Sequence, residues 1–276
     1  FSRDDNGGHG KGANDEIHNC DGNDDDWRGD AGDKSDGNWE DRSAPITNTA
    51  SLDPIAVADS LVKGHHTSRV WAGQLIGVNS SMSFSDDGGE TWTPNQGGPP
   101  LAATDHQTIA AGPYPESLAP LFPTPIYPNA FYYCGQDIGF ASCARSDNGG
   151  LTFNQPVPIY SINDCAGIHG HVRVAPDGSV AVPSKACGTN VAITVSEDAG
   201  NTWAIRKVPD SVPSIRDPSI AWATDNSAYL CHSENAARAL VTVTKDKGRT
   251  WEPSVELGAD MGIQHVMFTH MIAGDP

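Results

Sequence analysis

The chain has 276 residues and a formal net charge of −18, and 37% of its residues are hydrophobic. Its 29 glycines and 20 prolines favour an all-β, turn-rich protein with one large domain. The negative charge argues against nucleic acid as a partner, since phosphate groups would be repelled, and no apolar run reaches the length of a membrane span.

Residues 1–43 differ in composition from the rest of the chain. They hold 13 acidic and 5 basic residues, with almost no aliphatic side chains. Such a segment cannot bury enough apolar surface to fold alone, so we expect a disordered linker. The alternative is a segment ordered by Ca²⁺, because closely spaced Asp and Asn oxygens suit this cation, although the spacing is not that of an EF-hand. The chain begins at Phe1 without a signal peptide, which is typical of a processed or trimmed protein.

Four segments share the pattern Ser/Thr, any, Asp, any, Gly, any, Thr, Trp/Phe, and their first residues are spaced 61, 50 and 48 residues apart. A repeat near 50 residues suits the four-stranded blade of a β-propeller. Asn148 stands where the other copies have Asp. The restricted positions are Ser85, Asp87, Gly89 and Trp92; Ser146, Asn148, Gly150 and Phe153; Ser196, Asp198, Gly200 and Trp203; Thr244, Asp246, Gly248 and Trp251.

The chemistry of the repeat is that of a tight hairpin. The Asp or Asn oxygen can accept backbone hydrogen bonds, the Gly can adopt a positive φ, and the Thr and Trp can start a strand. We therefore expect each copy to close the outer hairpin of a blade, with the aromatic side chain buried beneath the turn. A metal-binding or acid–base role for these Asp residues is the weaker interpretation.

This pattern resembles the Asp-box, or bacterial neuraminidase repeat, and the resemblance covers roughly residues 45–276. Asp-box β-propellers include sialidases and many sialidase-like secreted proteins. The resemblance implies a β-propeller over residues 44–276, and it implies six blades if the protein is of the sialidase type. It does not by itself imply an activity, because a fold does not determine a function.

The repeat allows the blades to be placed along the chain. A less regular blade ends at residue 92, and three regular blades follow at residues 106–161, 169–211 and 217–259, the first of them with a Pro-rich insertion from Ser117 to Pro128. Residues 265–276 are expected to form the first strand of a fifth blade. Four blades and one strand suggest a longer parent protein, or closure of the ring by an N-terminal segment or a partner chain.

The six cysteines favour an oxidising, extracellular setting. Cys134 and Cys143 flank a predicted hairpin turn, and Cys165 and Cys187 bracket a strand–turn–strand segment. We therefore prefer these two pairings among the fifteen possible connectivities, which leaves Cys20 and Cys231. Reduced thiols in a cytosolic protein are the alternative.

Polar residues stand at the starts of the predicted innermost strands, which meet around the central channel of a propeller. The residues are Asp105, His106, His169, His171, Arg216, Asp217, Gln264 and His265. The histidines, with Asp105 and Asp217, form a candidate ligand or metal site for zinc or another transition ion. His-x-His on a strand should place both rings on one face. The alternative is that each histidine satisfies backbone groups at the end of a strand.

A sialidase needs more than this set. The family clamps the substrate carboxylate with three arginines and uses a Tyr nucleophile paired with a Glu. Arg173 and Arg216 are the best-placed arginines, Arg69 is a further candidate, and Arg145 and Arg249 lie beside or within the repeats. No Tyr–Glu pair is convincing, since Tyr114 and Glu116 lie in a Pro-rich segment. Asp105 and Asp217, with Arg173 and Arg216, are weak catalytic candidates for another glycoside hydrolase.

Three functions remain open. The preferred one is a secreted propeller that binds a glycan or another surface ligand at the channel face. The second is a glycoside hydrolase or lyase that uses the channel His/Asp set, with or without a metal such as Zn²⁺. The third is a structural or assembly module of a surface protein, with a Ca²⁺-tuned N-terminal segment and a homo-oligomer or partner chain that completes the propeller.

Overall fold

The computed structural model divides the chain into two units, Phe1–Arg42 and Ser43–Pro276. It describes residues 42, 44, 52–59, 69–76, 79–95, 105–118 and 127–274. The acidic segment, with Cys20, therefore lies almost entirely outside the described residues, and its linker or Ca²⁺-bound state stays a prediction. No helix in the described part is long and apolar enough to cross a membrane.

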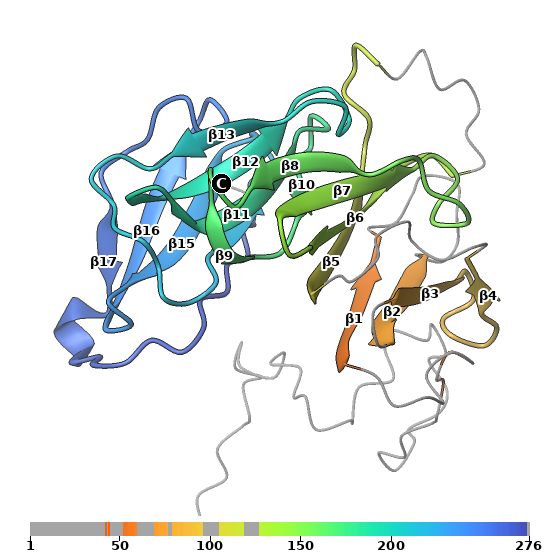
Figure 1. Cartoon of the computed structure of the whole chain (residues 1–276), viewed down its shortest axis with the longest axis horizontal. Coiled ribbons are helices and arrows are strands. Elements are labelled where there is room, and N and C mark those ends of the chain that lie inside the picture. Colours follow the sequence, from red (N-terminus) through yellow and green to blue (C-terminus); the bar gives the residue numbers. More distant parts are fainter. Residues whose placement is uncertain are drawn as a thin grey trace, which may run out of the picture. The chain divides into compact units, whose positions relative to one another are not determined.

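The second unit consists of four antiparallel sheets, labelled in Figure 1, and confirms the all-β propeller prediction. Blade 1 contains β1 (Leu52–Ala58), β2 (Val70–Ile76), β3 (Asn79–Ser85) and β4 (Thr93–Pro94). Blade 2 contains β5 (Asp105–Gly112), β6 (Ala130–Gln136), β7 (Phe140–Ser146) and β8 (Val157–Ser161). Blade 3 contains β9 (Ala166–His169), β10 (Arg173–Val174), β11 (Val180–Cys187), β12 (Asn190–Ser196) and β13 (Ala204–Lys207). Blade 4 contains β14 (Ser219–Trp222), β15 (Ala228–Glu234), β16 (Arg238–Thr244) and β17 (Val255–Leu257), followed by the short 3₁₀ helix η4 (Ala259–Met261).

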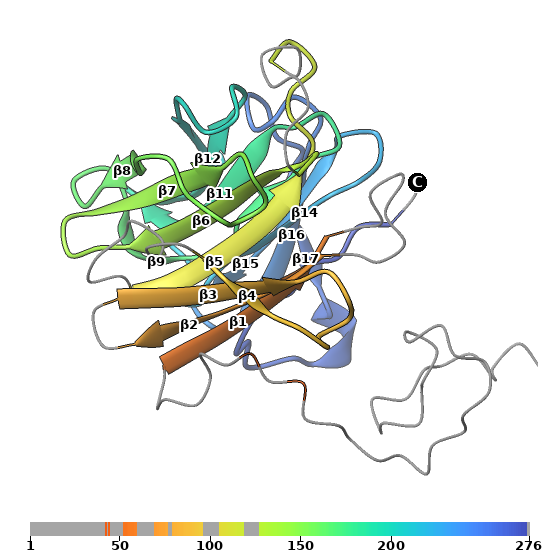
Figure 2. The same ribbon diagram turned by 90° about the vertical axis from the view of Figure 1, so that its right-hand side faces the viewer.

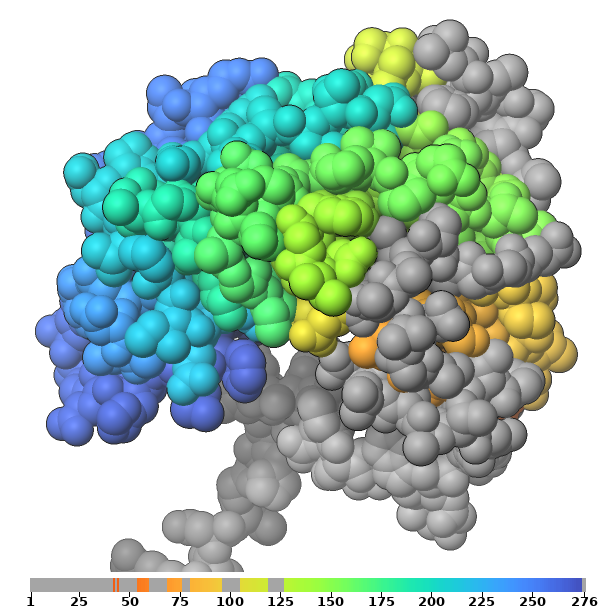
Figure 3. Space-filling model, viewed as in Figure 1, coloured from red at the N-terminus to blue at the C-terminus, as the bar shows by residue number. Residues whose placement is uncertain are grey.

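The first strands of the blades lie next to one another. β1 contacts β5, β5 contacts β10, and β10 contacts β14, and Figure 2 shows β5 between the strands of blade 1 and strands β6 and β7. On the face shown in Figure 3, the surfaces of blades 2, 3 and 4 pass into one another from green to blue without a gap. This arrangement brings the residues that precede or begin the first strands of several blades into one region, which is where the sequence placed a site.

The core consists of apolar layers between successive blades. Trp71 of blade 1 stacks on Phe131 of blade 2, with their ring centroids 4.4 Å apart. Val182 and Ala192 of blade 3 belong to the layer shared with blade 2, and Leu230 belongs to the layer between blades 3 and 4. Each layer excludes water from both sheets that face it, so burial of apolar area holds consecutive blades together.

The prediction of a fifth inner strand is wrong for the described residues: residues 263–274 form no strand. They nevertheless run beside blade 4. Val266 N–H donates to the Ala236 carbonyl over 2.8 Å, and Met271 N–H donates to Ser219 Oγ over 3.0 Å. These isolated hydrogen bonds do not make a ladder, because the backbone of the segment does not pair in register with β14.

The four repeated turn motifs close the hairpins between the third and fourth strands, as predicted. In blade 3, Thr202 N–H donates to Asp198 Oδ1 over 2.8 Å, Thr202 Oγ1–H donates to Asp198 Oδ2, and Gly200 N–H donates to Ser196 Oγ. The same bonds from backbone N–H groups recur in the other three copies. Asn148 departs only in that its amide donates to Thr152 Oγ1.

The aromatic residues of the motif are less enclosed than predicted. Trp92, Phe153, Trp203 and Trp251 are all half-buried. Phe153, Trp203 and Trp251 each pack against one of the interblade layers and keep part of the ring at the surface.

Both preferred disulfides are confirmed: Cys134–Cys143 joins paired residues of β6 and β7, and Cys165–Cys187 joins the start of blade 3 to the end of β11. Cys231 is a buried free thiol.

Candidate functional site

Polar side chains from blades 2, 3 and 4 converge where their first strands begin. The ring centroid of His106 lies 5.5 Å from that of His169 and 5.7 Å from that of His171. His106 Nε2 lies 3.9 Å from Asp217 Oδ2. Residues separated by more than 100 positions in the chain are therefore neighbours, as the alignment of first strands predicted.

The backbone at His106 is irregular, and this irregularity directs the side chain toward the cluster. Its φ is 51°, and the pairing of β5 with β6 shifts register between Asp105 and Thr108. The Asp105 carboxylate accepts a hydrogen bond of 2.8 Å from His106 N–H and so supports the bend. A left-handed non-Gly residue within a β-bulge is strained, and bulges of this kind redirect side chains next to functional sites.

His169 and His171 both lie close to the ring of His106, but they do not stand on one regular strand as the His-x-His pattern predicted. β9 ends at His169 and β10 begins at Arg173, and the residues between them leave the strand conformation. His169 is fully buried and His171 is exposed. The alternation of a regular strand does not apply across this break.

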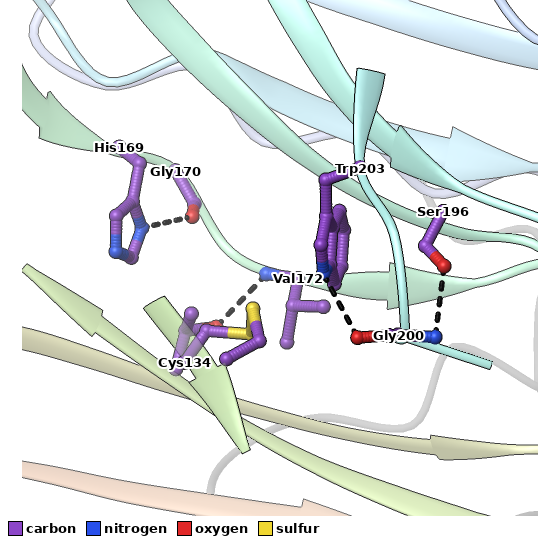
Figure 4. The surroundings of a disulfide bond; sticks show 9 residues. Cys134, His169, Gly170, Val172, Ser196, Gly200 and Trp203 are labelled. Atoms are coloured by element: carbon purple, nitrogen blue, oxygen red, sulfur yellow. Dashed lines mark hydrogen bonds between the residues drawn. A yellow bond between two sulfur atoms is a disulfide. The ribbon is translucent and has the colours of Figure 1, made fainter. Parts of the chain in front are cut away.

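His169 is fully buried and uncharged near neutral pH. Nδ1–H donates to the Gly170 carbonyl over 2.9 Å, and Figure 4 shows the ring near the Cys134 disulfide. Burial and the neighbouring charge of His106 lower the pKa of His169 to about 3. Its Nε2 atom has no hydrogen-bond partner within the described part of the chain.

His171 is exposed, so a ligand can reach it. Desolvation by the surrounding atoms, with the charges of His106 and Arg173, lowers its pKa to about 4. His270, from the segment beside blade 4, adds to the same effect. His171 is therefore an uncharged donor and acceptor near neutral pH.

Lys185 completes the cluster, although no sequence motif pointed to it. Its Nζ atom lies 3.2 Å from Asp217 Oδ1, and both side chains are about one-fifth exposed (20% and 22%). The signal was in the sheet register: Ser184 of β11 pairs with His169, so the next residue of β11 lies at the same level as the histidines. We name His106, His171, Lys185 and Asp217 the central cluster.

The other residues predicted for the site lie at the edge of the central cluster or away from it. His265 is exposed, and Asp105 uses its carboxylate on the backbone of its neighbour. Arg173 is partly buried and donates to the Val172 carbonyl over 3.1 Å. Arg216 Nη2 lies 3.9 Å from Met267 Sδ.

The other candidate arginines pair with carboxylates of the outer turns. Arg69 pairs with Asp86 and donates to the Gly149 carbonyl, Arg145 pairs with Asp147, and Arg249 pairs with Glu197. Each therefore neutralises a turn carboxylate.

Among the described residues, these contacts do not form the three-arginine clamp or the Tyr–Glu pair of a sialidase. Tyr114 OH donates to Asp147, a residue of the turn motif region, over 2.8 Å. Within the described residues, no three His, Cys, Asp or Glu side chains form a group that could hold a metal ion. The central cluster can instead offer one ammonium group, one carboxylate and two imidazoles to a polar ligand.

The chain is similar in fold to solved propellers at low sequence identity. No protein-family model matches the sequence, and no curated protein matches it. The lectin of Aleuria aurantia in complex with Fucα1-6GlcNAc is 12% identical with a TM-score of 0.54, and the match covers 80% of this chain and 68% of that chain. Another structure of the lectin, described as a six-bladed β-propeller, is 13% identical with a TM-score of 0.52 over 79% and 66% of the two chains.

A more distant likeness is to the NanB sialidase of Streptococcus pneumoniae, at 15% identity and a TM-score of 0.44, over 64% of this chain and 28% of that one. At these identities the likeness to the lectin shows the fold alone, so the chain is a β-propeller or part of one.

Proposed function

We propose that this chain is an extracellular propeller protein that binds a glycan at the central cluster. The observation that carries the proposal is the convergence of His106, His171, Lys185 and Asp217 from three blades. Sugar hydroxyl groups need donors and acceptors close together, and an ammonium–carboxylate pair beside neutral imidazoles supplies both. The partly exposed Lys185–Asp217 pair is open to such a ligand.

Three further features support this proposal. The lectin with the same fold binds Fucα1-6GlcNAc, which makes a carbohydrate a reasonable ligand class for this fold. Two disulfides favour an oxidising compartment. The hydrogen-bond pattern of the four turn motifs is the one that we expect of Asp-boxes, the repeat found in sialidase-like secreted proteins.

A glycan array, followed by calorimetric titration with the best glycan, tests the proposal. The double variant Lys185→Ala/His171→Ala should weaken binding at least about tenfold, equivalent to about 1.4 kcal/mol. Lys245→Ala is the matched control, because Lys245 is exposed on the turn after β16 and pairs only with Glu252 among the ion pairs described. No bound glycan, or equal binding by the double variant, would refute a carbohydrate site at the central cluster.

A second candidate function is protein assembly, which one observation supports. Met261, Met267, Phe268 and Ile272 are 61–82% exposed beside blade 4. In the same segment, Thr269 and Met271 bond to Asp217 and Ser219 at the start of β14, the first strand of blade 4. We propose that a second copy of the chain packs against this side.

Sedimentation velocity tests the assembly function. A concentration-dependent increase in mass that Phe268→Asp abolishes would support it. A protein that remains monomeric at all concentrations would refute it.

A further inference from the structure

A pocket lies between blades 3 and 4 and shares no lining residue with the central cluster. It has a volume of about 360 Å³, near the lower end of the range for small-molecule sites, roughly 300–1,000 Å³. Residues 209–212, which follow β13, form one wall, and the strands and outer turn of blade 4 form the other. Its principal lining residues are Asp210, Val212, His232, Glu234, Arg238 and Trp251.

Two buried polar groups in the lining have no hydrogen-bond partner within the described residues. Both ring nitrogens of His232 are in this state, and the residue is 0% exposed. The indole Nε1–H of Trp251 is the second such group. Burial lowers the pKa of His232, so the ring is an uncharged donor and acceptor. Unsatisfied buried groups of this kind are costly and indicate a missing water or ligand.

His232 is not required by the blade. In β15 it stands four residues after Ala228, which pairs with Thr244, the first residue of the turn motif. The same register places Gln74, Gly135 and Ser184 at this position in the other blades. A histidine in this place is therefore a property of one interblade space, and the repeating fold does not explain it.

The charges of the pocket select against an acidic ligand. The lining contains three carboxylates, those of Asp210, Glu234 and Glu252, and a single guanidinium, that of Arg238. Arg238 is already paired with Glu234 and, over 2.8 Å, with Glu256. An anion would meet excess negative charge, whereas a neutral hydroxyl group can donate to a carboxylate and accept from the guanidinium.

We propose that this interblade pocket binds a neutral, polyhydroxylated ring compound of about monosaccharide size. The half-buried ring of Trp251 offers an apolar face to the C–H side of such a ring, and Glu234 and Arg238 offer polar groups to its hydroxyls. The buried nitrogens of His232 and Trp251 can form hydrogen bonds with the ligand or with a water molecule bound beside it. This site does not depend on the central cluster.

Calorimetric and saturation-transfer NMR titrations test the site with methyl α-D-glucoside, methyl β-D-galactoside and methyl α-D-mannoside, and with an N-acetylneuraminic acid glycoside as the acidic comparison. Ser254→Trp places a large ring at the exposed rim of the pocket without changing a core residue. Ile138→Trp is the matched control, because Ile138 is 89% exposed on the β6–β7 turn. Thermal unfolding of each variant establishes that it is folded.

We expect saturable binding of at least one neutral glycoside below about 10 mM, and a loss of at least about tenfold in Ser254→Trp alone. Lys185→Ala/His171→Ala should bind this ligand as the unaltered protein does, which separates this site from the central cluster. The inference is overturned if no neutral glycoside binds, if folded Ser254→Trp binds as well as Ile138→Trp, or if the acidic glycoside binds most tightly.

Discussion

Protonation of His169 should make the protein sensitive to mild acid. The ring has an ordinary pKa of about 6.5 in the unfolded chain, and burial lowers its pKa to about 3 in the folded protein. The unfolded state therefore binds the proton first, and stability falls as the pH drops below about 6.5 and continues to fall until about 3. At pH 5 the unfolded ring is almost fully protonated, which lowers the free energy of unfolding by about 2 kcal/mol relative to pH 7.5.

The assay is urea unfolding at pH 7.5 and pH 5.0, followed by far-ultraviolet circular dichroism. This window lies above the range in which the turn carboxylates titrate, since Asp87 and Asp246 have pKa values lowered to about 2 by hydrogen bonds from Thr91 and Thr250. His232 is also buried and adds an acid-sensitive contribution of its own, so the comparison must be between variants.

His169→Asn is the matched variant, because the Asn amide can donate to the Gly170 carbonyl as Nδ1–H does. The loss of stability from pH 7.5 to pH 5.0 should be about 2 kcal/mol smaller in this variant than in the unaltered protein. Equal losses in the two proteins would mean that His169 takes up its proton as easily when folded, and the argument from burial would fail.

Three further changes test the packing and the turns by the same unfolding assay. Gly170→Ala should lower the free energy of unfolding by more than about 2 kcal/mol, because the added Cβ would overlap a backbone carbonyl of the loop before β14. Gly139→Ala is the control and should change it by less than about 1 kcal/mol, because no atom lies within 4 Å of its added Cβ. Equal effects of the two substitutions would refute the close contact. Replacement of both Cys165 and Cys187 by Ala should cost about 3 kcal/mol, because the bond closes a loop over a separation of 22 residues, and an unchanged urea midpoint would contradict this. Asp198→Ala should lower the free energy of unfolding by about 1–2 kcal/mol, because the hydrogen bonds that Ser196 and Thr202 donate to the carboxylate are lost. Asp198→Asn should lower it less, and equal losses in the two variants would show that these hydrogen bonds are unimportant.

The blades could be predicted because the repeated motif is a local device. Ser196, Asp198 and Gly200 determine the turn through bonds that span only a few residues, so the position of each hairpin follows from the sequence. The disulfides followed for the same reason, since both join segments of a single blade. The failed expectations, a strand at residues 263–274 and deep burial of the motif aromatics, depend on what packs against them, and a local pattern does not contain that information.

The candidate site could be predicted only in part. Aligning the first strands correctly brought together His106, His171 and Asp217, because a propeller places equivalent positions side by side. Lys185 and His270 were missed, since one enters from a second strand and the other from an irregular segment. The pocket at His232 was missed as well, because its walls come from two blades and no sequence pattern links them.

One close backbone contact explains the form of the central cluster. Gly170 N–H donates to the Pro183 carbonyl over 2.7 Å, and a Cβ at this position would overlap the Pro218 carbonyl oxygen, so the chain can pass here only without a side chain. The break in the strand at this glycine sends His169 inward and His171 outward. Because Pro218 follows Asp217 directly, the same contact brings that carboxylate next to the histidines. A substitution at Gly170 should therefore disturb ligand binding and stability together, which distinguishes it from a substitution in the cluster itself.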